Sequence, residues 1–427
     1  MQIHVVQQGQ SLYGIGQAYG IPYEEIAKAN ELIDPSRIVV GQALVIPITG
    51  SYHWVQPGQS LYIISRLYGT TVEELARING ISPNSILYVG QRLAIPQRRK
   101  SIIDVFLYVE PREATIDSTV QEVRNRVEDL TYLGMFSYEA QRDGSLKAPP
   151  IDDIPEIAAQ SGVLNAMVVS NLENFAFSPD LANVLFTNQT VQNRLFENIV
   201  ATAKRIGYTD IHFDFEFVRP ADRELYNTFL RNARARFRPE GLTLSTALPP
   251  KMSDDPTGVY GGIDYKAHGE IADFVTLMTY EWGYSYSDPQ AVSPLNQVRR
   301  VVEYAVSQVP PEKIFLGQNL YGYDWTFPYP PETGVAARAL SPQQAVNLAI
   351  SRNANIQFDP VAQAPFFLYW DNDGVRHDVW FEDARSIQAK FNLIKEFNLR
   401  GIMYWKLGLA FPQNWLLLTD NFTIRKR

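Results

Sequence analysis

The chain has 427 residues, of which 45% are hydrophobic and 12% aromatic, enough to fill several domain cores, so intrinsic disorder is excluded as its main state. Its formal net charge of −8 argues against a nucleic-acid-binding protein, which needs a basic face to neutralise phosphates. The absence of cysteine excludes disulfides, a thiolate nucleophile, Cys-ligated zinc and iron–sulfur clusters.

The N-terminal residues carry no pattern of an export signal. They lack a basic segment, an apolar core and a small-residue cleavage site. No stretch of the sequence reaches the roughly 18 apolar residues that a membrane-spanning helix needs. We therefore expect neither a secretory signal peptide nor a membrane partner.

The first hundred residues consist of one unit that occurs twice. Residues 4–47 align without a gap on residues 53–96, and about half of the aligned positions are identical. Each copy predicts the order strand, helix, helix, strand, because Ser11 can cap a first helix and Gly20 can end it. The two modules are expected to span residues 1–48 and 51–97.

This repeated pattern resembles the LysM module, a βααβ domain that binds glycans containing N-acetylglucosamine, such as peptidoglycan and chitin. Gly-Gln-Ser-Leu stands in both copies where Gly-Asp-Thr-Leu is the commonest form. The resemblance implies a sugar groove between two loops of each copy. Its expected residues are Gly9, Ser11, Leu12, Asn30 and Leu32 in the first copy, and Gly58, Ser60, Leu61, Asn79 and Ile81 in the second. An alternative is that the repeats serve only in dimerisation or in assembly into a protein coat.

A short basic linker at residues 97–101 is expected to keep the modules close to the rest of the chain. Beyond it, eight apolar runs alternate with amphipathic helical stretches, which is typical of parallel strands in an α/β domain. We expect a (β/α)8 TIM barrel over residues 101–427, with a small α+β insertion at about residues 324–385. The expected strands are residues 102–109, 132–138, 166–171, 210–218, 242–247, 274–280, 314–321 and 401–407.

The fourth of these runs is the strongest local indication of a function. In residues 210–217, ionisable and apolar side chains alternate, so a strand would place all four ionisable groups on one face. Buried groups of this kind are unfavourable unless they form a hydrogen-bonded network or take part in chemistry. Asp214 and Glu216 are one pleat repeat apart, so one of them is expected to keep its proton near neutral pH and to act as a general acid.

A metal site on His212 is another interpretation of the same run. The remaining candidates, His268 and His377, do not have metal-ligand spacing from it. We therefore expect no metal and no other cofactor.

The run also resembles the signature of glycoside hydrolase family 18, Asp-x-x-Asp-x-Asp-x-Glu. Asp214-Phe-Glu216 matches its end, Met278-Thr-Tyr280 resembles the Met-x-Tyr of the sixth strand, and Trp405 resembles the tryptophan that supports the sugar. The resemblance implies hydrolysis with retention, in which the 2-acetamido group of the substrate attacks the anomeric carbon. It implies that Glu216 is the acid and base, that Asp214 orients the acetamido group, that Tyr280 hydrogen-bonds its oxygen, and that Trp405 lies under the sugar.

The sequence departs from the family at several positions. Thr209 and His212 stand where the first two aspartates would be, with Asp210 shifted by one, so the family's inner proton relay is not expected to carry over. Glu281 follows the tyrosine where an aspartate is frequent, and Asn171 occupies a position where glycines are common. The further residues expected to contact substrate are Met278, Glu281, Asn171, His212 and Asp210.

The chain as a whole resembles the peptidoglycan hydrolases of bacterial spores. That resemblance implies an N-acetylglucosaminidase that acts on cortex glycan during germination, synthesis in the mother cell, and a location at the boundary of spore coat and cortex. It implies peptidoglycan as the partner and allows spore coat proteins as further partners. The alternatives are a chitinase or chitooligosaccharide hydrolase, and a catalytically silent glycan-binding coat protein, against which the presence of Glu216 counts.

Overall fold

The computed structural model describes residues 1–96, 100–111 and 117–426. Its two N-terminal modules have the same construction. The first consists of β1 (Gln2–Val5), α1 (Leu12–Tyr19), α2 (Tyr23–Ala29) and β2 (Ala43–Ile46), and the second of β3 (Ser51–Trp54), α3 (Leu61–Tyr68), α4 (Val72–Ile78) and β4 (Arg92–Ile95). In each module the two strands pair antiparallel. The order strand, helix, helix, strand is as predicted.

The ends of the first helix follow the signals in the sequence. The hydroxyl of Ser11 accepts a hydrogen bond from the backbone N–H of Gly14, which satisfies one free donor at the start of α1. Gly20 ends α1 in the left-handed conformation, with φ of 74°, which glycine adopts without a steric penalty. Ser60 and Gly69 bound α3 in the same way.

Within the described residues, eight parallel strands close into a barrel, because β20 pairs with β5 and β5 pairs with β6. The barrel strands are β5 (Ser101–Val109), β6 (Tyr132–Ala140), β8 (Leu164–Ser170), β11 (Asp210–Asp214), β12 (Thr243–Leu248), β13 (Phe274–Leu277), β14 (Ile314–Asn319) and β20 (Gly401–Trp405). Four further strands among the described residues lie at its ends: β7 (Leu146–Lys147) pairs with β6, β21 (Phe422–Ile424) pairs with β5, and β9 (Leu172–Glu173) forms a hairpin with β10 (Ala176–Phe177). The predicted (β/α)8 fold is confirmed.

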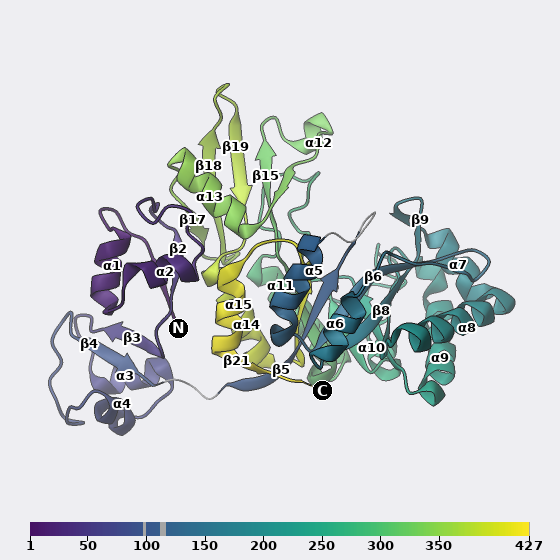
Figure 1. The fold of residues 1–427 in the computed structure, drawn as a ribbon, viewed down its shortest axis with the longest axis horizontal. Helices are drawn as coiled ribbons and strands as arrows, with labels where there is room; N and C mark the ends of the chain where they lie inside the picture. The colour runs from purple at the N-terminus through teal and green to yellow at the C-terminus, as the bar shows by residue number, and fades with distance from the viewer. Residues whose placement is uncertain (97–99, 112–116, 427) are drawn as a thin grey trace.

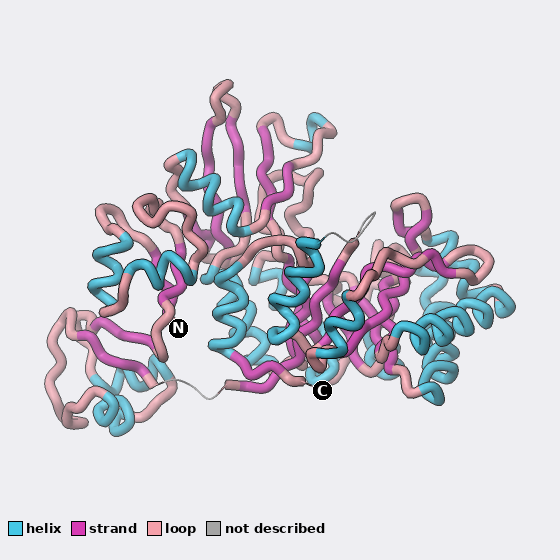
Figure 2. Tube along the Cα trace, viewed as in Figure 1, coloured by secondary structure: helices cyan, strands magenta, loops and turns pink. Residues whose placement is uncertain are grey.

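Helices surround the strands (Figure 2). They are α5 (Asp117–Arg126), α6 (Ile154–Gln160), α7 (Pro179–Thr187), α8 (Gln189–Ile206), α9 (Arg223–Phe237), α10 (Tyr265–Ile271), α11 (Leu295–Gln308), α14 (Ala384–Phe397) and α15 (Pro412–Asn421). The larger apolar core lies between strands and helices, whereas a smaller one inside the barrel is rich in aromatic rings such as Phe106, Tyr132, Phe274 and Phe315. Branched aliphatic side chains usually fill the inside of such barrels, and here aromatic rings take much of that space. No described helix combines the length and apolar character needed to cross a bilayer.

The fourth strand is shorter than predicted. β11 ends at Asp214, whereas the alternation of polar and apolar residues continues to Phe217. Phe217 has a φ of 54° and is 52% exposed, so the prediction that the strand continues through residue 218 is wrong. Glu216 consequently lies on the loop above the barrel and not in its wall.

An α+β insertion stands over the C-terminal end of the barrel, between β14 and α14 (Figure 1). Its five-stranded antiparallel sheet has the order β16-β15-β19-β18-β17. The elements are β15 (Gly322–Thr326), α12 (Pro330–Thr333), β16 (Arg338–Leu340), α13 (Pro342–Arg352), β17 (Gln357–Asp359), β18 (Ala364–Trp370) and β19 (Arg376–Trp380).

The first module is docked against both the barrel and the insertion. The amide of Gln413 on α15 donates to the side-chain oxygen of Asn30 and to the carbonyl of Ala43, each at 2.8 Å. The backbone N–H of Ile356 in the insertion donates to the carbonyl of Val40 at 2.9 Å. Three residues of the linker that was expected to hold the modules, 97–99, lie outside the described residues, but these contacts show that module 1 is held by direct packing.

Candidate active site

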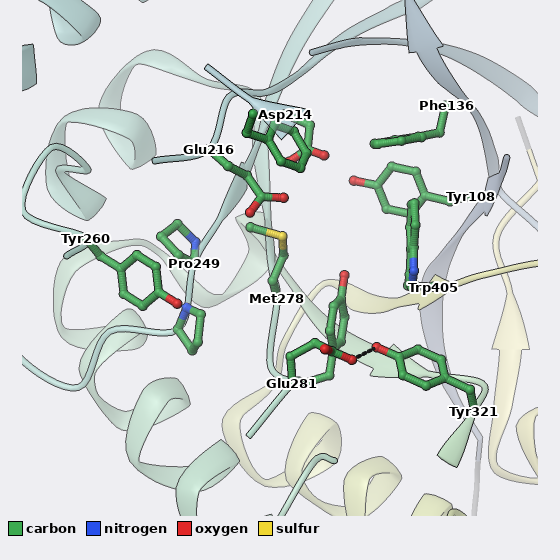
Figure 3. A pocket seen from close by; sticks show the side chains of 13 residues that line it. Tyr108, Phe136, Asp214, Glu216, Pro249, Tyr260, Met278, Glu281, Tyr321 and Trp405 are labelled. Carbon is green, nitrogen blue, oxygen red and sulfur yellow. Dashed lines mark hydrogen bonds between the residues drawn. The ribbon is translucent and has the colours of Figure 1, made fainter. Parts of the chain in front are cut away.

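A cleft of about 270 Å³ opens at the C-terminal ends of the barrel strands, where TIM-barrel enzymes place their chemistry (Figure 3). It is lined by Tyr108, Phe136, Phe177, Asp214, Glu216, Pro249, Pro250, Tyr260, Met278, Tyr280, Glu281, Tyr321 and Trp405. Six of the nine barrel residues expected at the site are among them: Asp214, Glu216, Met278, Tyr280, Glu281 and Trp405. The structure therefore gathers residues from several strands around one cleft.

Two carboxyl groups lie next to each other on one side of the cleft (Figure 3). Asp214 is the last residue of β11, and Glu216 follows it by two positions. Burial raises the pKa of Asp214 to about 7. Burial, together with the nearby carboxylates of Asp214 and Glu281, raises the pKa of Glu216 well above its ordinary value. Both effects favour the protonated form of Glu216, the form that a general acid uses.

The backbone of Glu216 is held by one buried amide. Asn171, which directly follows β8, donates from Nδ2 to the carbonyl of Glu216 and accepts from its N–H at Oδ1, both at 3.0 Å. The same Nδ2 donates to the carbonyl of Ser178 at 3.0 Å. Asn171 is fully buried behind the acid and does not line the cleft, which corrects the expectation that it contacts substrate: its contacts are those of a positioning residue.

Glu281 is held at the other side of the cleft by two tyrosines from the start of the insertion. The hydroxyl of Tyr321 donates to its Oε1 (Figure 3), and the hydroxyl of Tyr323 donates to the same oxygen at 3.1 Å. Burial raises the pKa of Glu281, and the two hydroxyl donors act in the opposite direction. Tyr280, the preceding residue, has a pKa raised far above its usual range by burial, so its hydroxyl keeps its hydrogen for donation.

Trp405 ends β20 and forms the wall that faces Glu216 across the cleft (Figure 3). Its ring packs edge-on against Phe136 and Tyr108, with ring centroids 4.8 and 5.4 Å away. These contacts fix the plane of the indole at the edge of the cleft.

Asp210 and His212 do not line the cleft, although contact with substrate was expected of them. Both are fully buried inside the barrel, deeper than Asp214. Ser245 donates to Asp210 Oδ2 at 2.5 Å and lies 2.7 Å from His212 Nδ1, while Tyr108 lies 2.6 Å from His212 Nε2. Ser245 and Tyr108 could not be predicted from the sequence, because each lies on a strand far from residue 212 in the chain.

The chemistry of the four groups fixes the direction of their hydrogen bonds. Burial lowers the pKa of His212 to about 3, so the ring is neutral and carries one N–H. Because Ser245 gives its hydrogen to Asp210, its oxygen accepts from Nδ1–H of His212, and Nε2 then accepts from the hydroxyl of Tyr108. A continuous chain of donors thus runs from the cleft to Asp210, and burial raises the pKa of Asp210 to about 6.

Among residues 1–96, 100–111 and 117–426, no group of three or more His, Asp and Glu side chains is placed to hold a metal ion. His268, which was considered as a partner of His212, bonds Thr246 on the outer side of β12 instead.

The residues expected in the LysM grooves differ in exposure. Gly9, Ser11, Gly58 and Ser60 lie at the surface or near it, whereas Leu12 and Leu61 are core residues. The amides of Asn30 and Asn79 bridge a helix and a strand of their own module, through bonds to residues 45 and 94. A contact between these two side chains and a glycan stays a prediction, and their observed contacts serve the fold.

Comparison with known proteins agrees with this division of the chain. The sequence model of glycosyl hydrolases family 18 matches residues 132–410, and that of the LysM domain matches residues 4–47 and 53–96. The chain is 58% identical to the cortical fragment-lytic enzyme of Bacillus subtilis (strain 168) and 50% identical to that of Bacillus anthracis, over 100% of this chain and 99% and 100% of the relatives. The crystal structure of the Bacillus megaterium QM B1551 spore cortex-lytic enzyme SleL superposes with a TM-score of 0.92 at 48% identity, covering 100% of this chain and 99% of that one.

Proposed function

Because the chain belongs to glycosyl hydrolases family 18 and carries two LysM domains, we propose that it is a retaining N-acetylglucosaminidase that cleaves the glycan strands of spore cortex peptidoglycan. Family membership makes it a glycoside hydrolase. Relatives that match it over their whole length are named for lysis of cortex, which supports cortex peptidoglycan as the substrate. The observation that carries the catalytic part is the position of Glu216 beside Asp214 in the cleft, where burial and the neighbouring carboxylates raise the pKa of Glu216.

In the proposed mechanism, Glu216 gives its proton to the glycosidic oxygen while the acetamido carbonyl oxygen of the substrate attacks the anomeric carbon. Asp214 orients the acetamido group, and Tyr280 donates a hydrogen bond to its oxygen. Glu216, now ionised, takes a proton from the water that opens the resulting ring. Two displacements at one carbon retain its configuration. Asp214 lies beside Glu216 and not across the cleft from it, which supports a role for Asp214 in assistance and not as a nucleophile (Figure 3).

The LysM modules anchor the enzyme to peptidoglycan in this proposal. The enzyme would act during germination at the boundary of the spore coat and the cortex, where coat proteins are further proposed partners. Chitin is the alternative substrate, because both the LysM resemblance and the acetamido chemistry serve it. A silent glycan-binding coat protein is disfavoured by the acid at position 216.

The test compares wild type with Glu216→Gln on purified spore cortex and on colloidal chitin, with the products identified by mass spectrometry. We expect cortex fragments ending in reducing N-acetylglucosamine, and a loss of turnover by roughly 10²- to 10⁴-fold in the variant, because a positioned general acid contributes about that much. Glu332→Gln, which changes an exposed carboxylate of the insertion, is the matched control and should keep full activity.

Each part of the proposal has its own contradicting result. If the protein released products from chitin and none from cortex, chitin would be the substrate and the cortex assignment would be wrong. Near wild-type turnover of Glu216→Gln would contradict the assignment of the acid. A first-formed product of inverted anomeric configuration, detected by NMR during the initial turnover, would contradict substrate assistance.

A further inference from the structure

A small hairpin rises from the rim of the barrel directly after β8, at the side of the cleft that carries Glu216. It is formed by β9 and β10 and stands away from the barrel body (Figure 1). Phe177 at its base lines the cleft, and the ring of Phe217 lies 6.4 Å from that of Phe177. Phe175 at its tip is fully exposed. Aromatic side chains therefore stand at both ends of the hairpin, with Phe177 in the cleft and Phe175 at the tip.

Phe175 at the tip has a backbone conformation that phenylalanine rarely adopts. Asn174 and Phe175 form the two-residue turn of the hairpin, with φ of 54° and 65°. Such a turn needs positive φ at both positions, for which Asn-Gly is the favoured pair. A phenylalanine in the second position meets steric strain that glycine avoids. Neither burial nor local conformation thus accounts for Phe175.

The hairpin is held firmly in place despite its exposure. Arg142 donates two hydrogen bonds to the carboxylate of Glu173, at 2.6 and 2.7 Å, and Ser178 donates a third at 2.9 Å. An arginine that binds a carboxylate through two hydrogen bonds fixes its orientation, and here the carboxylate belongs to β9. Phe175 is therefore presented to the solvent at a fixed place.

The hairpin and the catalytic loop share one anchor. Asn171 accepts the backbone N–H of Ser178 at its own carbonyl and donates from its side chain to the carbonyls of Ser178 and Glu216. Because residues 171 and 178 flank the hairpin, its base and the backbone of Glu216 are fixed relative to each other.

We propose that this hairpin is a second glycan-contacting site. In this site Phe175 stacks on the apolar face of a sugar ring in the part of the substrate glycan that extends out of the cleft. Phe177, at the base of the same hairpin, connects this position with the cleft. An exposed aromatic side chain on a fixed backbone suits sugar stacking, because its flat ring gives a large contact area and only two side-chain torsions lose freedom. The proposal rests on the proposed function for the kind of ligand, a glycan with N-acetylated sugars.

The test uses the full chain and the variant Phe175→Gly, which removes the ring and supplies the residue that the turn favours. Its melting temperature is expected to equal or exceed that of wild type, so lost binding cannot be ascribed to misfolding. We expect KM for long soluble cortex fragments to rise roughly fivefold, the size expected for one aromatic contact, with kcat unchanged. KM for a chromogenic chitin disaccharide, which is too short to reach the tip, should not change.

Two further variants sharpen the comparison. Phe175→Trp keeps a flat ring and should keep the wild-type KM for long fragments. Trp370→Ala, which removes a 61% exposed aromatic side chain from the hairpin of the insertion, controls for the general loss of surface aromatics and should have no effect.

An unchanged KM of Phe175→Gly for long fragments that wild type cleaves would overturn this proposal alone. If wild type cleaves chitin and not cortex, the same comparison is made with long chitin oligosaccharides, and the cortex assignment fails independently. Wild type that neither cleaves nor binds these glycans would contradict both proposals. An equal loss in Trp370→Ala would assign the effect to surface character and would also overturn the role of the hairpin.

Discussion

At the scale of single residues, the proton on Glu216 depends on its charged neighbours. Burial and the carboxylates of Asp214 and Glu281 all raise its pKa. The raised pKa extends the protonated form of Glu216 to higher pH, and activity should fall as pH rises through that pKa. Removing one negative neighbour lowers that pKa.

We accordingly expect Glu281→Gln to move the basic limb of the pH profile of kcat to lower pH. The profile is measured on cortex fragments, with Glu332→Gln as the exposed control that should leave the limb in place. If the basic limb of the kcat profile stayed at its wild-type pH in Glu281→Gln, the charge at position 281 would not affect the pKa of Glu216.

Single residues were predicted well where their signal was local in sequence. Asp214, Glu216, Tyr280 and Trp405 belong to short motifs at strand ends, and the structure brings them to one cleft. Their catalytic roles stay predictions. Tyr323, which donates to Glu281, could not be assigned, because its partner is 42 residues away and nothing in the sequence pairs them.

At the scale of elements, alternation along a strand indicates which face a side chain occupies but not how deep it lies. Asp210, His212 and Asp214 share the inner face of β11, as the sequence predicted. Only the last reaches the cleft, since the other two lie further down the barrel. The same alternation overestimated the strand, because it continues in a loop that no longer pairs with β8 or β12.

The neighbouring strand β12 offers a matched test of the buried chain. Ser245 faces inward and bonds His212, whereas Thr246 faces outward and bonds His268. Ser245→Ala removes the acceptor that keeps the proton of His212 on Nδ1. With the proton on Nε2, the Tyr108 hydroxyl becomes an acceptor from His212 and can turn its own hydrogen toward the cleft.

A new donor near Asp214 stabilises its ionised form, so its pKa should fall below about 7. We expect the limb of the pH profile of kcat/KM that Asp214 sets to move to lower pH in Ser245→Ala. Thr246→Val, which removes an equally buried hydroxyl bonded to a buried histidine, should leave the profile unchanged. Equal shifts in both variants would contradict a specific connection through His212.

At the scale of the whole molecule, the sequence predicted the modules, the barrel and the insertion, because each has a strong internal pattern. It could not predict how module 1 meets the barrel. That junction depends on side chains such as Gln413, whose partners lie 370 and 383 residues away. No periodicity links such distant positions.

Gly41 tests this junction. A methyl group there would lie 1.7 Å from the carbonyl oxygen of Ile356, so Gly41→Ala should loosen module 1. A loss of about 1.4 kcal/mol in docking corresponds to a roughly tenfold larger undocked population. We expect faster hydrogen exchange at the amide of Ile356, which donates to Val40, with activity on a chitin disaccharide unchanged.

The second module provides the control. Gly90 is the equivalent glycine, with φ of 82° against 84° for Gly41, and has open space around it. Gly90→Ala brings the same backbone strain without the clash, and exchange at Ile356 should stay as in wild type. If the amide of Ile356 exchanged at the wild-type rate in Gly41→Ala, the junction would have accommodated the methyl group without undocking.

The direct docking of module 1 bears on which bonds of a glycan strand the barrel can reach. When a flexible linker joins a binding module to a catalytic domain, the catalytic domain can cleave any bond within the linker's reach, and its effective concentration at the strand falls as the linker lengthens. Module 1 packs directly on the barrel, so a glycan strand bound to it would reach Glu216 at a fixed distance from the bound sugars. The released fragments would then have a narrow range of lengths set by the junction, and a loosened module would widen that range.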